Sequence, residues 1–173
     1  MRTAWLLLSG VILGGCATLL HGSPQATADL KNARGQAVGT ASFWEDASGV
    51  RIITQVRGLP HGKHGFHLHA VGKCDPPEFT TAGAHFNPGR KRHGLKNSQG
   101  PHAGDLPNLE VAADGSGRLE YVTKLVTLGS GPASLFDADG TALVIHANPD
   151  DDVTDPTGNS GGRIACGTLR KAS

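Results

Sequence analysis

Two histidines stand one residue apart in the stretch "GFHLHAVGKC", at His67 and His69. Along a strand, side chains at positions i and i+2 share a face and lie about 6–7 Å apart, so both imidazoles can reach one metal ion. Single histidines follow in "AGAHFNP", "RHG", "PHAGD" and "LVIHANPDD". Imidazole nitrogens suit both copper and zinc, and a carboxylate can complete a zinc site. The sequence therefore predicts a metal centre built from histidines and an aspartate.

The order and spacing of these motifs resemble those of the copper,zinc superoxide dismutases. "GFHLH", "AGAHFNP", "HG", "HAGDL", "LVIH" and "GGRIACG" follow one another in the family's order between about Ala28 and Leu169. The resemblance implies one copper and one zinc per chain, with His85 bridging the two metals as an imidazolate. The copper ligands it implies are His67, His69, His85 and His146, and the zinc ligands are His85, His93, His102 and Asp105.

The resemblance also implies an activity, the dismutation of superoxide to oxygen and hydrogen peroxide by copper alternating between Cu(II) and Cu(I). His85 and Arg163 are then the catalytic residues, the first for proton supply and the second for capture of the anion. Asp150 would link a copper histidine to a zinc histidine, Thr157 would line the same funnel as Arg163, and His64 would pack beneath the copper strand. The alternative is a dismutase-like protein that binds copper and zinc without turnover.

One position departs from the family pattern. Pro156 stands where eukaryotic members commonly place a lysine that guides the anion, and the loop around it is shorter. Electrostatic steering would then be weaker or come from other cations. The candidates are Lys73, Arg90, Lys91 and Arg92.

The elements that position these residues have the pattern of strands. In 36–45, Gly39, Ala41 and Phe43 alternate with polar neighbours, and 50–58 alternates in the same way. Further strands are expected at 65–72, 118–128, 141–147 and 162–170, whereas the segments 73–110 and 147–161 lack strand patterning. Long loops in a compact domain are usually functional. The predicted fold is all-β, a Greek-key, immunoglobulin-like β-sandwich or flattened barrel with long metal-binding and electrostatic loops.

The N-terminus has the pattern of an exported chain. Arg2 precedes an apolar stretch, 5–13, that is too short to span a bilayer, and the "LGGC" that follows resembles the lipobox of bacterial lipoproteins. The predicted division is a lipoprotein-type signal peptide at 1–15, a flexible tether at 16–27 and a copper,zinc superoxide dismutase domain at 28–173. Lipidation of Cys16 would anchor the protein to a membrane in the periplasm, and Ala17 suits the outer membrane. An ordinary signal peptide, with Cys16 lost on cleavage, is the alternative.

The other two cysteines are Cys74 and Cys166. In an oxidising compartment they can form a disulfide or remain two buried thiols, and the resemblance implies the disulfide. The formal net charge of +1 and the absence of a basic stripe exclude a nucleic-acid partner. The expected partners are the superoxide anion and a membrane surface, and the resemblance allows both a monomer and a homodimer.

Overall fold

The computed structural model describes residues 22–172, and this part of the chain forms nine strands and one short 3₁₀ helix. The strands are β1 (Ala26–Asn32), β2 (Ala37–Asp46), β3 (Gly49–Val56), β4 (Gly62–His69), β5 (Asp105–Val111), β6 (Gly117–Thr123), β7 (Ala142–His146), β8 (Arg163–Thr168) and β9 (Arg170–Lys171). The helix η1 (Thr80–Ala82) lies between β4 and β5. Within 22–172, no helix is long and apolar enough to cross a membrane. The predicted signal peptide and Cys16 lie outside the described residues.

The strands close into an antiparallel barrel. They are hydrogen-bonded in the order β2-β3-β6-β5-β4-β7-β8-β1, and β1 also pairs with β2, which completes a ring of eight strands. The short β9 continues along the edge of β1 beyond β8. The strand order is not sequential, because β3 neighbours β6 and β4 neighbours β7, so the chain crosses repeatedly between the two sides of the barrel, as in a Greek key. The predicted all-β fold is confirmed.

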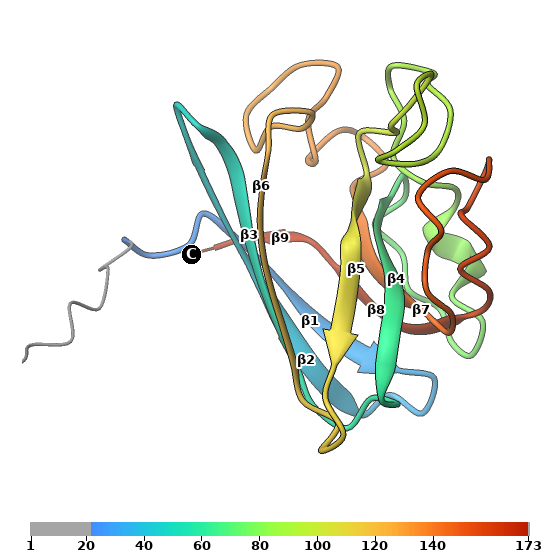
Figure 1. Cartoon of the computed structure of the whole chain (residues 1–173). Helices are drawn as coiled ribbons and strands as arrows, with labels where there is room; N and C mark the ends of the chain where they lie inside the picture. Colours follow the sequence, from blue (N-terminus) through green and yellow to red (C-terminus); the bar gives the residue numbers. More distant parts are fainter. Residues whose placement is uncertain (1–21, 173) are drawn as a thin grey trace, which may run out of the picture.

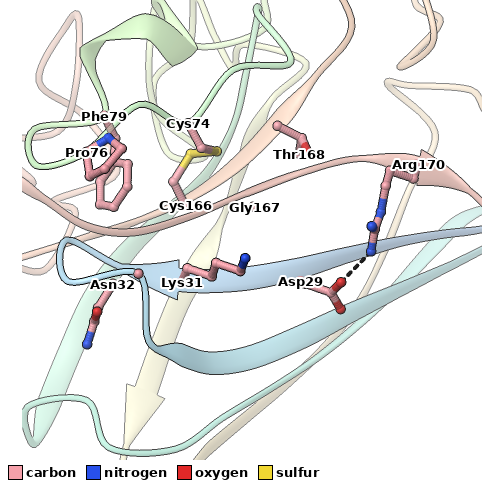
Figure 2. Close-up of a pocket in the computed structure, with 11 residues that line it drawn as sticks. Asp29, Lys31, Asn32, Cys74, Pro76, Phe79, Cys166, Gly167, Thr168 and Arg170 are labelled. Atoms are coloured by element: carbon pink, nitrogen blue, oxygen red, sulfur yellow. Dashed lines mark hydrogen bonds and ion pairs between the residues drawn. A yellow bond between two sulfur atoms is a disulfide. The ribbon is translucent and has the colours of Figure 1, made fainter.

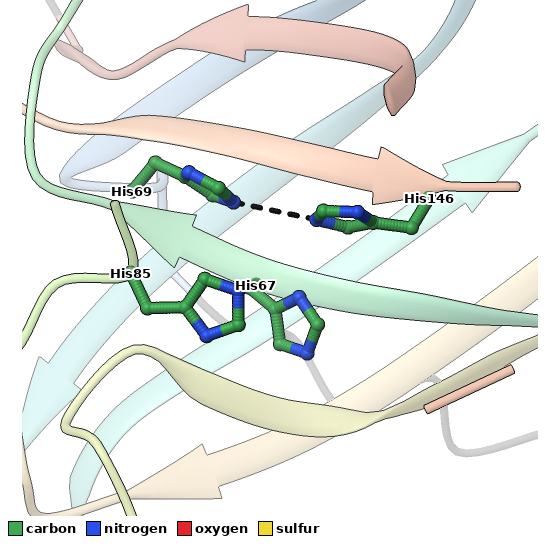
Figure 3. Close-up of side chains that lie close together, drawn as sticks. All are labelled: His67, His69, His85 and His146. Atoms are coloured by element: carbon green, nitrogen blue, oxygen red, sulfur yellow. Dashed lines mark hydrogen bonds between the residues drawn. The ribbon is translucent and has the colours of Figure 1, made fainter. Parts of the chain in front are cut away.

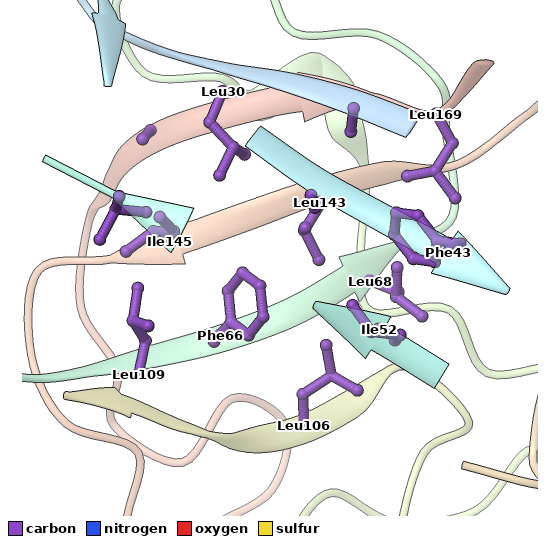
Figure 4. Packing of buried hydrophobic residues seen from close by; sticks show 14 of the residues in the cluster. Leu30, Phe43, Ile52, Phe66, Leu68, Leu106, Leu109, Leu143, Ile145 and Leu169 are labelled. Atoms are coloured by element: carbon purple, nitrogen blue, oxygen red, sulfur yellow. The ribbon is translucent and has the colours of Figure 1, made fainter. Parts of the chain in front are cut away.

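The barrel has two sides with different surroundings. Figure 1 shows β1, β2, β3 and β6 on one side and β4, β5, β7 and β8 on the other, with the long loops beside β4 and β7. The interior is filled by alternate residues of the strands, among them Phe43, Ile52, Phe66 and Leu68 (Figure 4). Since Phe66 and Leu68 point inward, His67 between them and His69 after them point outward, where the loops bury them.

Several strand boundaries differ from the sequence prediction. β4 spans Gly62–His69, three residues earlier than the predicted 65–72, and the predicted strand 162–170 is divided into β8 and β9. β5 begins at Asp105, inside the segment 73–110 that was expected to lack strands, because pairing with β4 outweighs the poor strand propensity of "DLPN". β1 begins at Ala26, inside the predicted tether. β6 ends at Thr123, not at residue 128, because the carboxylate of Glu45 accepts hydrogen bonds from Thr127 Oγ1 (2.6 Å) and Leu128 N (2.8 Å) and holds this segment in a loop.

A disulfide joins Cys74 to Cys166, which confirms the pairing implied by the family resemblance. Cys74 lies in the loop after β4, and Cys166 lies in β8, three residues after Arg163 (Figure 2). The bond therefore fixes the segment between β4 and β5, residues 70–104 and hereafter the first long loop, to the strand that carries Arg163.

Candidate metal centre

Strand register places the histidines around one point on the outer face of the barrel. His67 lies opposite Asp105 of β5 and Val144 of β7. His69 pairs with Ala142 of β7 and makes an isolated bridge with His85 from the first long loop. At the end of β7, His146 lies opposite Arg163 of β8. Residues from distant parts of the sequence are thus brought together by antiparallel pairing.

A first cluster consists of four buried histidines, each with one ring nitrogen within 4.8 Å of the others: His67, His69, His85 and His146. The Nε2 atoms of His69 and His146 lie 3.4 Å apart, and Figure 3 shows the two rings pointing toward each other. The rings of His67 and His85 stack with centroids 4.0 Å apart. These are the four residues that the family resemblance implies as copper ligands.

Hydrogen bonds on the outer nitrogens fix how these rings are turned. His69 Nδ1 donates to Gly83 O (2.9 Å), His146 Nδ1 donates to Gly161 O (3.1 Å) and His67 Nε2 donates to Asp150 Oδ2 (2.6 Å). The remaining nitrogens of these rings face the cluster with their lone pairs. His67 Nδ1 and His85 Nε2 are buried without any hydrogen-bond partner. Buried polar atoms normally have partners, so a cation bound by four imidazole nitrogens fits this cluster.

Burial keeps these four imidazoles neutral. It lowers the pKa of His67 to about 3 and that of His146 to about 4. It also lowers the pKa of His69 well below the usual value and that of His85 below it. Because only the neutral ring offers a lone pair, each ring of the first cluster can offer one nitrogen to a metal at neutral pH.

A second cluster surrounds one oxygen of Asp105. Its Oδ1 lies 3.0 Å from His85 Nδ1, 3.0 Å from His93 Nδ1 and 3.3 Å from His102 Nδ1. Its Oδ2 accepts hydrogen bonds from the backbone N–H groups of Gly94 (2.8 Å) and His102 (2.9 Å). Burial would raise the pKa of Asp105, but hydrogen bonds with the three histidines hold it far below its usual range. Three nitrogens and one anionic oxygen are a donor set that suits tetrahedral zinc.

The fourth member of this second cluster requires a choice between His67 and His102. One donor atom from each of His67, His85, His93 and Asp105 lies within 4.8 Å of the others. The Nε2 of His67, however, donates to Asp150, and its Nδ1 is the partnerless atom of the first cluster. His102 Nδ1 faces both Asp105 and His85 Nδ1, which lies 3.4 Å away. We therefore assign His102 to the second cluster. His85 belongs to both clusters, through Nε2 and Nδ1.

Asp150 connects the two clusters. Its buried carboxylate accepts hydrogen bonds from His67 Nε2 (2.6 Å) and His93 Nε2 (3.0 Å). Burial opposes ionisation of Asp150, but these two bonds keep its pKa well below the usual value. Burial likewise opposes protonation of His93, yet hydrogen bonds to Asp105 and Asp150 raise its pKa to about 9. The two carboxylates thus favour a His93 ring that donates from both nitrogens, one to Asp105 and one to Asp150.

The second long loop, residues 147–162 between β7 and β8, passes over the carboxylate of Asp150 at Gly158. Its φ is +60°, and a Cβ atom there would lie 1.8 Å from Asp150 Oδ1 and 2.7 Å from His93 Nε2. Only glycine allows the loop to pass so close to the buried carboxylate.

A cavity of about 600 Å³ opens beside the first cluster. Its lining includes His69, His85 and His146 together with Thr157, Pro156 and Arg163. Arg163 is the one lysine or arginine among the lining residues. Its Nη1 donates to Phe79 O (2.6 Å) and its Nη2 to Gly83 O (2.6 Å), and burial lowers its pKa.

The other predicted residues are placed as follows. His64 is buried and its two ring nitrogens lie 2.8 Å from His146 O and 2.8 Å from Pro60 O. The four candidate steering residues, Lys73, Arg90, Lys91 and Arg92, are exposed and do not line the cavity.

Two polar residues near the site were missed by the sequence reasoning. Asn108 of β5 holds the backbone of Asp150, accepting from its N–H (2.7 Å) and donating to its C=O (2.8 Å). Asp155 Oδ1 accepts from the backbone N–H of His93 (2.6 Å). A polar residue inside a strand was the only signal for Asn108, and Asp155 resembles any loop acid.

Comparisons with known proteins agree with this geometry. Residues 37–169 match the family described as copper/zinc superoxide dismutase. Two proteins of Aquifex aeolicus, named Superoxide dismutase [Cu-Zn] 1 and 2, are 48% and 46% identical to this chain. The first alignment covers 83% of this chain and 86% of that protein, and the second covers 94% and 98%.

A relative from Bacillus subtilis is named as dismutase-like and not as a dismutase. Superoxide dismutase-like protein YojM is 44% identical over 81% of this chain and 73% of that protein. The crystal structure of a SOD-like protein from Bacillus subtilis superposes with a TM-score of 0.80 at 42% identity, covering 83% of this chain and 97% of that one.

Proposed function

The chain belongs to the copper/zinc superoxide dismutase family, and we propose that it dismutates superoxide at the centre shared by the two clusters around His85. Copper would be held by His67, His69, His85 and His146, and zinc by His85, His93, His102 and Asp105. Copper supplies a site that takes up and returns one electron, and zinc is redox-inert. The observation that carries the proposal is that His67 Nδ1 and His85 Nε2 are buried without a hydrogen-bond partner, in a cluster of four histidines with donor atoms within 4.8 Å of one another.

Residues around the cavity and the two clusters have separate proposed roles in anion binding, proton supply and ligand orientation. Arg163 stays charged at any relevant pH and offers several donors, so it attracts and orients a small anion. His85 Nδ1 is directed at the second cluster and Nε2 at the first. Nε2 would therefore take up a proton for the peroxide product only when its bond to copper is released. Asp150 keeps His67 and His93 turned toward their clusters.

A second candidate function is metal binding without turnover, which the name of the Bacillus subtilis relative brings forward. The two candidates differ in one experiment. Purified protein is stripped of metal and reloaded first with zinc and then with copper, and superoxide decay is followed by stopped-flow absorbance. Dismutation that returns with copper and is weakened in Arg163→Ala supports the enzyme. Full metal loading without dismutation supports the binding protein.

The site of action is part of the proposal. Arg2, the apolar stretch 5–13 and "LGGC" support export and lipidation of Cys16 at the periplasmic face of the outer membrane. A disulfide is typical of an oxidising compartment. Replacing Cys16→Ser should move the protein from the membrane fraction to the soluble periplasmic fraction. An unchanged distribution would contradict the lipid anchor. The homodimer that the resemblance allows would be seen by analytical ultracentrifugation.

A further inference from the structure

Phe79 holds a backbone conformation that residues other than glycine seldom adopt. Its φ of 54° and ψ of 26° lie in the left-handed region, immediately before η1. Glycine adopts this conformation freely, whereas a bulky residue there is an outlier. Such strained residues persist where the surrounding structure fixes them, and they cluster at functional sites. The position therefore calls for an explanation in the contacts of Phe79.

The ring of Phe79 anchors the first long loop to the barrel. The residue is 2% exposed and packs in a small apolar cluster with Ala82, Ala142, Val144 and Cys166, separate from the main core. Figure 2 shows it near the disulfide, at the wall of a surface cavity of about 330 Å³. Since Ala142 and Val144 belong to β7 and Cys166 to β8, the ring fixes the loop to the two strands that carry His146 and Arg163.

The carbonyl of Phe79 holds the guanidinium of Arg163. Phe79 O accepts from Arg163 Nη1 (2.6 Å) and from the backbone N–H of Ala82 (3.2 Å). The second guanidinium nitrogen donates to Gly83 O (2.6 Å), the carbonyl that also accepts from His69 Nδ1. Both acceptors thus come from the short loop that the Phe79 ring holds in place. The orientation of the guanidinium depends on the position of this loop.

Arg163 keeps its charge available for a ligand. Among residues 22–172, no carboxylate forms an ion pair with it. A guanidinium has five N–H donors, and the two hydrogen bonds to carbonyls leave others for the cavity. Neutral carbonyls orient the group without cancelling its charge, which is what capture of a small anion requires.

We propose that Phe79 is a positioning residue for the anion site, acting through Arg163. The buried ring fixes the left-handed turn, the turn aims the carbonyl, and the carbonyl orients the guanidinium toward the cavity. A small monovalent anion is the ligand class concerned. The inference rests on the proposed role of Arg163, and its test separates the two.

The test measures azide binding to the copper- and zinc-loaded protein by the change in copper absorbance. Phe79→Gly removes the ring but accepts the positive φ, so the turn can form while its anchor is lost. Phe79→Leu is a second variant that keeps an apolar side chain in the pocket. Phe43→Leu, in the main core on β2, is the matched control for loss of a buried ring. Circular dichroism and metal content verify that each variant is folded and loaded.

The expected result is azide binding weakened about tenfold in Phe79→Gly and less in Phe79→Leu, with Phe43→Leu at the wild-type value. In Arg163→Ala the azide affinity also falls, and the double variant Phe79→Gly/Arg163→Ala binds azide like Arg163→Ala alone, because Phe79 acts through the arginine. Wild-type affinity in Phe79→Gly with weakened binding in Arg163→Ala would overturn the inference and leave the role of Arg163 standing. Wild-type affinity in Arg163→Ala would overturn both. An additive loss in the double variant would show that Phe79 acts by another route.

Discussion

Replacing Asp150→Asn is expected to weaken binding of both metals, because one carboxylate serves a histidine of each cluster. The carboxylate accepts from His67 at 2.6 Å and from His93 at 3.0 Å, and it is buried. An asparagine has one acceptor oxygen, and its NH₂ group would face the N–H of the other imidazole. One histidine then loses the bond that fixes its orientation. Loss of such a partner usually lowers metal affinity about 10- to 100-fold, or about 1.4–2.7 kcal/mol.

The neighbouring aspartate provides a matched control for this substitution. Among residues 22–172, the carboxylate of Asp151 accepts hydrogen bonds from its own loop only, from the backbone N–H groups of Val153 and Thr154 and from Asn159 Nδ2. Zinc and copper affinities of the wild type, Asp150→Asn and Asp151→Asn would be measured by competition with a chromophoric chelator. The reasoning predicts a loss for both metals in Asp150→Asn and less than about a twofold change in Asp151→Asn. Unchanged affinities in Asp150→Asn, or equal losses in both variants, would refute it.

Three further predictions concern the disulfide, acid and salt. The double variant Cys74→Ser/Cys166→Ser opens a loop spanning 92 residues, so its free energy of unfolding in urea should fall by about 4–5 kcal/mol; a loss below about 1 kcal/mol would contradict the chain-entropy estimate. The metal-free protein should lose thermal stability as the pH falls below 6.5, because the first-cluster histidines have lowered pKa values, near 3 for His67 and 4 for His146, and the unfolded chain takes up protons there first. A melting temperature that is flat or higher at pH 4.5 would count against this. Raising the ionic strength should slow dismutation less than in relatives that carry a lysine at the position of Pro156, since Arg163 is the one lysine or arginine lining the cavity; an equally steep salt dependence would contradict it.

Much of the fold could be predicted from alternation. The pattern around Phe43 and Ile52 gave β2 and β3 with the correct faces, because both strands bury one side on the main core. β5 could not be predicted, because its "DLPN" start is poor strand sequence and forms only through pairing with β4. The end of β6 was likewise set by a distant residue, Glu45.

The metal-ligand residues could be predicted from their motifs, but the contacts that hold the site residues in position could not. The pair His67 and His69 is readable from spacing because a strand places both on one face. The strained turn at Phe79 and the clamp of Asn108 on Asp150 depend on backbone atoms brought together by the fold. Backbone carbonyls and amides occur in residues of every type, so the sequence does not show which of them will make a contact. These contacts are seen only in the structure.

The most direct test of the account is a crystal structure of the metal-loaded protein with anomalous scattering measured at the copper and zinc edges. We predict a copper peak bounded by His67 Nδ1 and the Nε2 atoms of His69, His85 and His146. A zinc peak should lie among the Nδ1 atoms of His85, His93 and His102 and Asp105 Oδ1, so that the ring of His85 separates the two metals. Zinc bound by His67 in place of His102, or both metals in one cluster, would contradict the bridged centre on which the proposed function depends.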